Sequence, residues 1–176
     1  MSYKKKNANK AFWHDARTIV LYVAGMFLLL KVIFVVAYIP TGSMKPTINE
    51  DSAVIGWRLC YLLSDPMPER GEIIIFNHEE FDGHLVKRVI GLPGDDVCII
   101  MGKVFVNGKE LEENYLAEPG NIFYDEEFLV PEGQLFVLGA NRNHSNDSRF
   151  WNNHFVKIEA VYAKVILRIN WNWRHT

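Results

Sequence analysis

The stretch Ile39-Pro40-Thr41-Gly42-Ser43-Met44-Lys45-Pro46-Thr47 marks the point where the character of this sequence changes. A long apolar run precedes it, and short apolar segments separated by Gly, Pro, Asn and Asp follow it. A serine between a glycine and a methionine, directly beyond such a run, is an unusual place for a hydroxyl group. The sequence therefore predicts a membrane segment, a folded region after it, and a serine of interest at their junction.

The apolar run covers residues 18–39 and contains one charged side chain, Lys31. A helix of about 22 residues is roughly 33 Å long, which matches a hydrocarbon core of about 30 Å. The long stem of Lys31 can carry its ammonium group toward the headgroups. A cleavable signal peptide and a buried helix of a soluble protein are the alternatives. The run exceeds the roughly 7–15 apolar residues of a signal peptide, so its length favours a retained transmembrane anchor.

Basic residues gather before the apolar run, at Lys4, Lys5, Lys6, Lys10 and Arg17. Positive charge beside a membrane span favours the cytoplasmic side. We therefore expect a cytoplasmic N-terminus over residues 1–17, a single-pass anchor over 18–39 and an extracytoplasmic domain over 40–176.

Composition limits the remaining possibilities. The chain has 176 residues, of which 49% are hydrophobic and 23% charged, so one domain with a real core is expected beside the anchor. The net charge of −2 gives no electrostatic argument for nucleic acid as a partner. Two cysteines, Cys60 and Cys98, do not make a disulfide framework, and buried free thiols are favoured over a pair.

Short apolar runs with turn residues between them dominate the region after Pro40. They predict strands at 53–57, 72–76, 85–90, 97–101, 104–106 and 134–138, and one or two more within 156–169. Asn107-Gly108 is a strong hairpin signal. The pattern predicts a mainly β domain, an antiparallel sheet or barrel-like structure behind one N-terminal transmembrane helix. Residues 114–127, which are acidic and poorly patterned, are predicted to form an exposed connection.

Lys87 lies within the predicted strand at 85–90. Side chains alternate along a strand, so Lys87 shares a face with Leu85 and Val89 while Arg88 points the other way. Apolar surroundings favour the neutral form of a lysine, and a neutral lysine can act as a base toward a serine. A lysine that extends to solvent from a half-buried strand is the more ordinary interpretation of this pattern alone.

The third polar element is the run from Gly139 to Arg149, which follows a predicted strand and is rich in turn formers. It can hold an amine with a hydroxyl group and can be tied down by an ion pair of Asp147 with Arg149 or with Arg88. An ordinary polar turn is the alternative. The histidines have no recognised ligand spacing, so no metal and no cofactor are expected. A triad of Ser43, His144 and Asp147 is conceivable, but Lys87 makes it unnecessary.

Taken together, these segments resemble type I signal peptidases of the single-span kind, the membrane-anchored Ser/Lys proteases that remove signal peptides from exported proteins. The resemblance rests on four motifs in order behind an anchor: Ser43-Met44-Lys45-Pro46-Thr47, Arg70-Gly71-Glu72-Ile73-Ile74-Ile75-Phe76, Lys87-Arg88-Val89-Ile90-Gly91-Leu92-Pro93-Gly94-Asp95, and residues 139–149. It covers nearly the whole chain and implies a place in the bacterial cell membrane.

The resemblance also implies roles for single residues. Ser43 would be the nucleophile and Lys87 the general base in acyl-enzyme chemistry. Ser145 would orient the lysine amine, and the Thr41 hydroxyl with the Ser43 backbone N–H would form the oxyanion hole. The supporting residues would be Arg88, Asp147 and Arg149, and a shallow pocket for small substrate side chains would be lined by Ile39, Pro40, Met44, Leu85 and Val86. The implied partners are secretory preproteins and the lipid bilayer, without nucleic acid.

Two positions depart from the family pattern. Its last motif usually begins Gly-Asp-Asn where this chain has Gly139-Ala140-Asn141, and Glu72 stands where aspartate is commoner. The missing carboxylate puts the rigidity of the loop in doubt. The alternatives are a peptidase dedicated to one precursor, such as a conjugative pilin, and an inactive membrane-tethered β-domain that binds exported chains.

Overall fold

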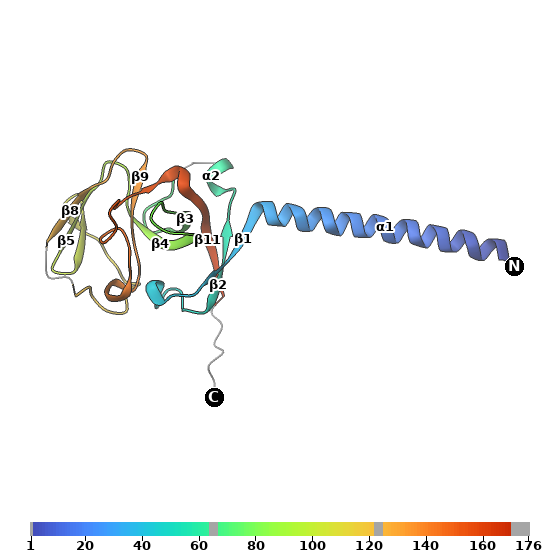
Figure 1. Cartoon of the computed structure of the whole chain (residues 1–176), viewed down its shortest axis with the longest axis horizontal. Coiled ribbons are helices and arrows are strands. Elements are labelled where there is room, and N and C mark those ends of the chain that lie inside the picture. Colours follow the sequence, from blue (N-terminus) through green and yellow to red (C-terminus); the bar gives the residue numbers. More distant parts are fainter. Residues whose placement is uncertain (1, 64–66, 122–124, 170–176) are drawn as a thin grey trace, which may run out of the picture. The chain divides into compact units, whose positions relative to one another are not determined.

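The computed structural model describes residues 2–63, 67–121 and 125–169, and the chain divides into two units, 1–34 and 35–176 (Figure 1). The first unit is the helix α1 (Ser2–Ile33). Within the described residues, its part Trp13–Ile33 is the one helix long and apolar enough to cross a membrane, with a mean hydropathy of 1.9. Its large apolar side chains, such as those of Leu21 and Phe27, are exposed, as lipid-facing side chains would be.

The helix ends six residues before the predicted end of the span. Phe34–Ile39 forms the strand β1, which lies beside β2 (Ser52–Trp57) at the edge of a sheet. Val36 and Tyr38 are exposed while Ile39 is buried, an alternation that a strand produces. The prediction of one apolar span over 18–39 was therefore wrong in its last part, because an apolar strand and the end of an apolar helix have the same hydropathy.

The second unit contains two sheets. The larger has seven strands in the order β1-β2-β11-β3-β4-β9-β10, and the smaller has four in the order β7-β6-β5-β8. Every pairing with a defined register is antiparallel, which confirms the predicted fold class. The other elements are η1 (Gly42–Met44), α2 (Cys60–Leu63), β3 (Ile73–Asn77), β4 (His84–Gly91), β5 (Asp96–Ile100), β6 (Lys103–Val106), β7 (Lys109–Glu110), β8 (Glu126–Leu129), β9 (Gln134–Leu138), η2 (Arg142–His144), β10 (Val156–Lys157), η3 (Ile158–Ala160) and β11 (Val161–Ile169).

The predicted exposed connection at 114–127 is wrong at both ends. Glu126 and Glu127 begin the strand β8, which pairs with β5 and buries Phe128. Tyr115 is half-buried and packs against a core cluster. A four-residue strand that begins with two acidic residues has too weak a pattern to be recognised in the sequence.

One apolar cluster joins the two sheets. It contains Ile90 and Phe136 from the larger sheet with Val97, Val104 and Phe128 from the smaller one. Gly91 lies at a register shift between β4 and β9. A Cβ atom at position 91 would lie 2.7 Å from Val130 Cγ2 and 2.8 Å from Val97 Cγ2, so the packing at this position admits only glycine.

Gly91→Ala is expected to lower the free energy of unfolding by about 1–3 kcal/mol, because the added methyl group overpacks the interface between the sheets. Denaturant unfolding of the purified chain measures this. Val97→Ala removes one of the two methyl groups that the new Cβ atom meets, so the double variant should be more stable than the sum of the two single effects predicts. Strict additivity would contradict the packing argument.

Candidate active site

Ser43 sits in the 3-10 turn η1, immediately after the edge strand β1. Two contacts tie this turn to the loop that follows β9. The Asn141 backbone N–H donates to Ser43 O at 3.0 Å, and Asn141 Nδ2 donates to Gly42 O at 3.1 Å. These bonds fix the backbone on either side of the Ser43 hydroxyl, although 99 residues separate Gly42 from Asn141.

Lys87 lies on β4, between β3 and β9, and its side chain is only 5% exposed. Its Nζ lies at hydrogen-bond distance, 2.8 Å, from Ser43 Oγ. Burial lowers the pKa of Lys87 to about 8, against an opposing effect of Asp147, while Arg149 lowers it further. The two residues that the sequence singled out thus meet in a buried site where the neutral amine is accessible near physiological pH.

Arg88 points away from Lys87, as strand alternation predicted. Its guanidinium group stacks 3.8 Å from the centre of the Tyr115 ring, and its Nη1 donates to Gly71 O at 2.7 Å. The charge beside Lys87 in the sequence is therefore held on the other side of the strand.

Asp147 is fully buried and organises the loop after β9. It accepts a hydrogen bond from the Gly139 backbone N–H at 2.9 Å, and Arg149 donates to both of its carboxylate oxygens, Nε at 2.7 Å and Nη2 at 2.9 Å. Of the two ion pairs that the sequence left open, the structure forms the one with Arg149. His144 is exposed and makes no hydrogen bond to Asp147 or Ser43 in the described structure, so the geometry does not assemble a histidine triad.

Ser145 is buried beside the backbone of the turn that carries Ser43. A Cβ atom at Gly139 would lie 2.1 Å from Ser145 Oγ and 2.5 Å from Ser43 O, so only glycine lets these segments meet. Within the described residues, Ser145 Oγ has no hydrogen-bond partner. A buried hydroxyl group without a partner needs an explanation, and a neighbouring amine or a substrate group would supply one. Thr41 Oγ1, on the other side, lies 3.4 Å from Ser43 Oγ.

The structure groups three of the five predicted pocket residues. Ile39, Met44 and Val86 belong to one apolar cluster, which also contains Ala140. Leu85 packs against a different cluster, and Pro40 is exposed. Ile39, Met44 and Val86 are buried core side chains, so the substrate pocket itself stays a prediction, and Leu85 does not share their cluster.

Sequence reasoning missed Glu113, Tyr115 and Arg142. Arg142 and Glu113 form an ion pair in which their side chains are only 2% and 8% exposed. Tyr115 donates from its hydroxyl group to Glu113 Oε1 at 2.5 Å. Tyr115 lies in the acidic stretch 114–127 that we assigned to an exposed connection, and Glu113 lies directly before it. Nothing in the pattern of this stretch signals burial.

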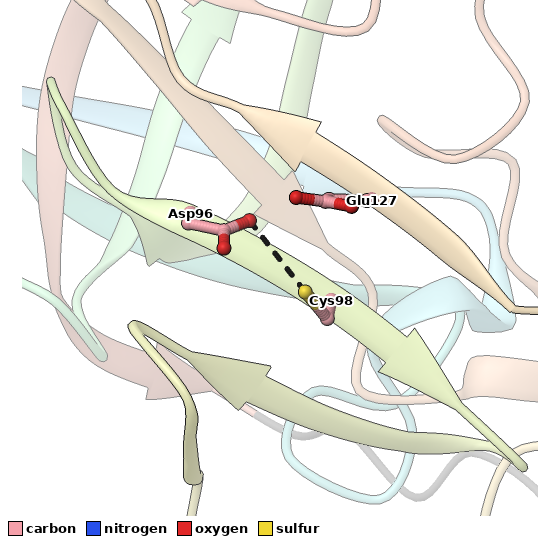
Figure 2. A group of neighbouring side chains, drawn as sticks. All are labelled: Asp96, Cys98 and Glu127. Carbon is pink, nitrogen blue, oxygen red and sulfur yellow. Dashed lines mark hydrogen bonds between the residues drawn. The ribbon is translucent and has the colours of Figure 1, made fainter.

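A possible metal-binding group lies on the smaller sheet. Asp96 and Cys98 project from β5 and Glu127 from the neighbouring β8, with their donor atoms within 4.8 Å of one another (Figure 2). The Cys98 thiol donates to Asp96 Oδ1 at 3.5 Å, and burial together with the Asp96 carboxylate raises its pKa, so the thiol form is favoured over the metal-binding thiolate. Cys98 and Cys60 are not joined by a disulfide.

Comparison with known proteins shows the family to which the chain belongs. Residues 12–171 match the profile of a family described as "Signal peptidase, peptidase S26". The chain belongs to this family. It is 43% identical over 137 residues to a probable signal peptidase I-2 of Synechocystis sp., a match that covers 74% of this chain and 61% of that protein. It is 34% identical over 155 residues to signal peptidase I P of Bacillus subtilis subsp. natto, with 83% and 82% of the two chains covered.

A solved structure supports the fold of this signal peptidase family member. The crystal structure of a signal peptidase I from Enterococcus faecalis V583 aligns with a TM-score of 0.50 at 35% identity, covering 57% of this chain and 97% of that chain. The chain spans 61% and 66% of the lengths of its relatives from Synechocystis sp. and Leptolyngbya laminosa.

Lys87→Met is expected to raise the free energy of unfolding at pH 7 by about 3 kcal/mol, because a pKa of about 8 instead of about 10.4 measures the cost of burying the charge. Below pH 8 lysine is charged in both the folded and the unfolded state, so the full cost applies. The gain should shrink as the pH rises from 8 to 10. Denaturant unfolding across this range checks it.

Lys157→Met, at an exposed position on β10, is the matched control and should change stability little at any pH. A gain from Lys87→Met that does not depend on pH would contradict the assignment of a depressed lysine pKa.

Proposed function

We propose that this chain is a serine endopeptidase that removes N-terminal signal peptides from exported preproteins with a Ser43/Lys87 dyad. The observation that carries the proposal is the 2.8 Å contact between Lys87 Nζ and Ser43 Oγ in a buried site. Membership of the signal peptidase family supports the substrate class.

The first half of the reaction forms an ester. Neutral Lys87 accepts the proton of the Ser43 hydroxyl group as Oγ attacks the carbonyl carbon of the scissile peptide bond. The negative charge that develops on the carbonyl oxygen is stabilised by the Ser43 backbone N–H and the Thr41 hydroxyl group. When the C–N bond breaks, protonated Lys87 returns its proton to the leaving amine, which is the new N-terminus of the mature protein.

The second half releases the signal peptide. Lys87, neutral again, accepts a proton from a water molecule that attacks the ester carbonyl. The acyl group then leaves Ser43 Oγ, which recovers its proton from Lys87. In this structure the buried Ser145 hydroxyl group has no hydrogen-bond partner, and we propose that it turns to the lysine amine and orients it during the reaction.

The surrounding residues hold the catalytic groups in place and select the substrate. Asp147 and Arg149 hold the loop of Ser145 in place, and Arg88 holds β4 beside Lys87. An extended substrate adds to strand edges near Ser43, with small side chains against Ile39, Met44 and Val86. The chemistry needs no cofactor.

The membrane arrangement is part of the proposal. The basic N-terminus remains in the cytoplasm, α1 crosses the bacterial cell membrane as a single pass within Trp13–Ile33, and the β-rich peptidase domain follows on the extracytoplasmic side. About ten residues separate Ile33 from Ser43, so the nucleophile stays within roughly 35 Å of the end of the span. This raises the local concentration of membrane-bound preproteins at the site.

Ser43→Ala and Lys87→Ala are each expected to abolish cleavage of a preprotein that carries an Ala-x-Ala site, because one removes the nucleophile and the other the base. The assay uses the full chain in detergent or liposomes, with the new N-terminus identified by mass spectrometry. Lys157→Ala should cleave like the unchanged protein.

Each alternative has its own outcome in this assay. Cleavage that survives either substitution would overturn the dyad. Cleavage of one precursor from a panel would identify a dedicated peptidase, and no cleavage by a folded chain that still binds preproteins would identify a binding domain.

The rate of cleavage should rise with pH along the acid limb with an apparent pKa of about 8, because only neutral Lys87 can accept the serine proton. Well below this value the rate should fall about tenfold for each pH unit. Initial rates at subsaturating substrate between pH 5 and about 10 measure the profile. A flat profile below pH 8 would exclude a lysine base.

A further inference from the structure

Glu113 forms an ion pair with Arg142, which belongs to the same loop as Ser145. Its Oε2 accepts a hydrogen bond from Arg142 Nη1 at 2.8 Å, and its Oε1 pairs with Arg142 Nη2. Arg142 in turn donates from Nε to Gly139 O at 3.1 Å, and its own carbonyl oxygen accepts from Arg149 Nη2 at 2.8 Å. A continuous path of charged hydrogen bonds therefore leads from Glu113 to the Asp147–Arg149 pair.

Tyr115 extends the same network to the strand of Lys87. Its hydroxyl group donates to Glu113, and the face of its ring supports the Arg88 guanidinium group at 3.8 Å. Among the described residues, no carboxylate forms an ion pair with Arg88. The contacts that hold its charge are the Tyr115 ring, Gly71 O and the Thr47 hydroxyl group.

The position where a carboxylate would be expected in this loop is apolar. Ala140 is only 2% exposed and packs with Met44 and Val86. Leu138, the last residue of β9, lies opposite Arg88 in the register of β4 and β9, and Ala140 follows two residues after it. The nearby negative charge that the loop lacks at this position comes instead from Glu113, which lies in a different part of the chain.

We propose that Glu113 and Tyr115 are positioning residues of the active site: Glu113 anchors the Ser145 loop through Arg142, and Tyr115 links that anchor to Arg88 on the strand of Lys87. This inference rests on the proposed peptidase function for its kinetic test. It assigns a function to a segment that does not touch the reacting atoms.

The energetic argument concerns buried charge. Removing the carboxylate leaves the Arg142 guanidinium group buried without its counter-charge, which is strongly unfavourable. The loop can avoid that cost by moving Arg142 toward water, which pulls on Gly139, the residue at which Ser145 and the Ser43 backbone approach each other. A displacement of about 1 Å at a catalytic group can reduce a rate about a hundredfold.

The effect on Lys87 has a definite sign. Asp147 and Arg149 are the charges that act on the Lys87 amine, and Glu113 is not among them. Loss of Glu113 therefore acts on Lys87 through the enclosure of the site. A displaced loop admits water, and because burial is the main cause of the low pKa of Lys87, hydration raises that pKa.

The experiment compares Glu113→Gln, Tyr115→Phe and Tyr115→Leu with the unchanged full-length chain in detergent. Glu110→Gln is the matched control, since it makes the same chemical change at an exposed ion pair with Lys103 on the smaller sheet. We expect kcat per folded molecule to fall roughly ten- to a hundredfold in Glu113→Gln with KM changed less than about threefold. Tyr115→Leu should lose more than Tyr115→Phe, which keeps the ring under Arg88.

A second measurement does not need turnover. Competitive acetylation of lysines as a function of pH, read by mass spectrometry, gives the pKa of Lys87 in each variant. We expect it to rise by roughly one pH unit in Glu113→Gln and to stay constant in Glu110→Gln.

These two measurements separate the possible failures. An inactive but folded parent chain would overturn the proposed function, and the lysine titration would still test the positioning role. An unchanged Lys87 titration and unchanged kcat in Glu113→Gln would overturn that role. A loss of activity that merely follows the unfolded fraction in thermal melts, with the titration unchanged, would also overturn it.

Discussion

The burial of one lysine amine against one serine hydroxyl is the constraint on which the rest of this structure depends. An exposed lysine is charged at physiological pH and cannot accept a proton. Here Lys87 lies buried in the middle of a central strand, and this burial lowers its pKa to about 8. The sheet on both sides supplies that enclosure, since β3 and β9 flank β4. The fold therefore serves the site by excluding water from one atom.

The loop after β9 adds to the burial of Lys87 without cancelling the resulting decrease of its pKa. A buried carboxylate near a lysine normally favours the charged amine, and Asp147 does act in this direction. Arg149 neutralises it by donating to both carboxylate oxygens. The loop thus obtains the rigidity of a buried ion pair while leaving desolvation as the dominant influence on Lys87.

The sequence was sufficient to single out the residues of the proposed dyad and insufficient for the residues that pack around them. Ser43, Lys87 and Asp147 lie in motifs whose order is informative, and strand alternation correctly separated Lys87 from Arg88.

The end of the apolar helix was misplaced because β1 is as apolar as the segment before it. Glu113 and Tyr115 were missed because their burial depends on partners about 27 to 29 residues away, Arg88 and Arg142, and local pattern carries no information at that distance. Leu85 and Val86 were predicted to share one pocket, but successive side chains of a strand point to opposite faces, so the two enter different clusters.

The alanine at position 140 affects both the packing and the charge balance of this loop. An aspartate there would lie in a cluster with Met44, Ile39 and Val86, and a buried carboxylate needs a partner that repays its desolvation. Alanine removes that requirement and packs with its apolar neighbours. The loop still contains Arg142, whose charge is almost fully buried and must be balanced. Glu113 balances it from a segment outside the loop, so the support of the site has been moved to a different part of the chain. The counter-charge that the buried Arg142 requires is thus supplied by a residue that no motif contains.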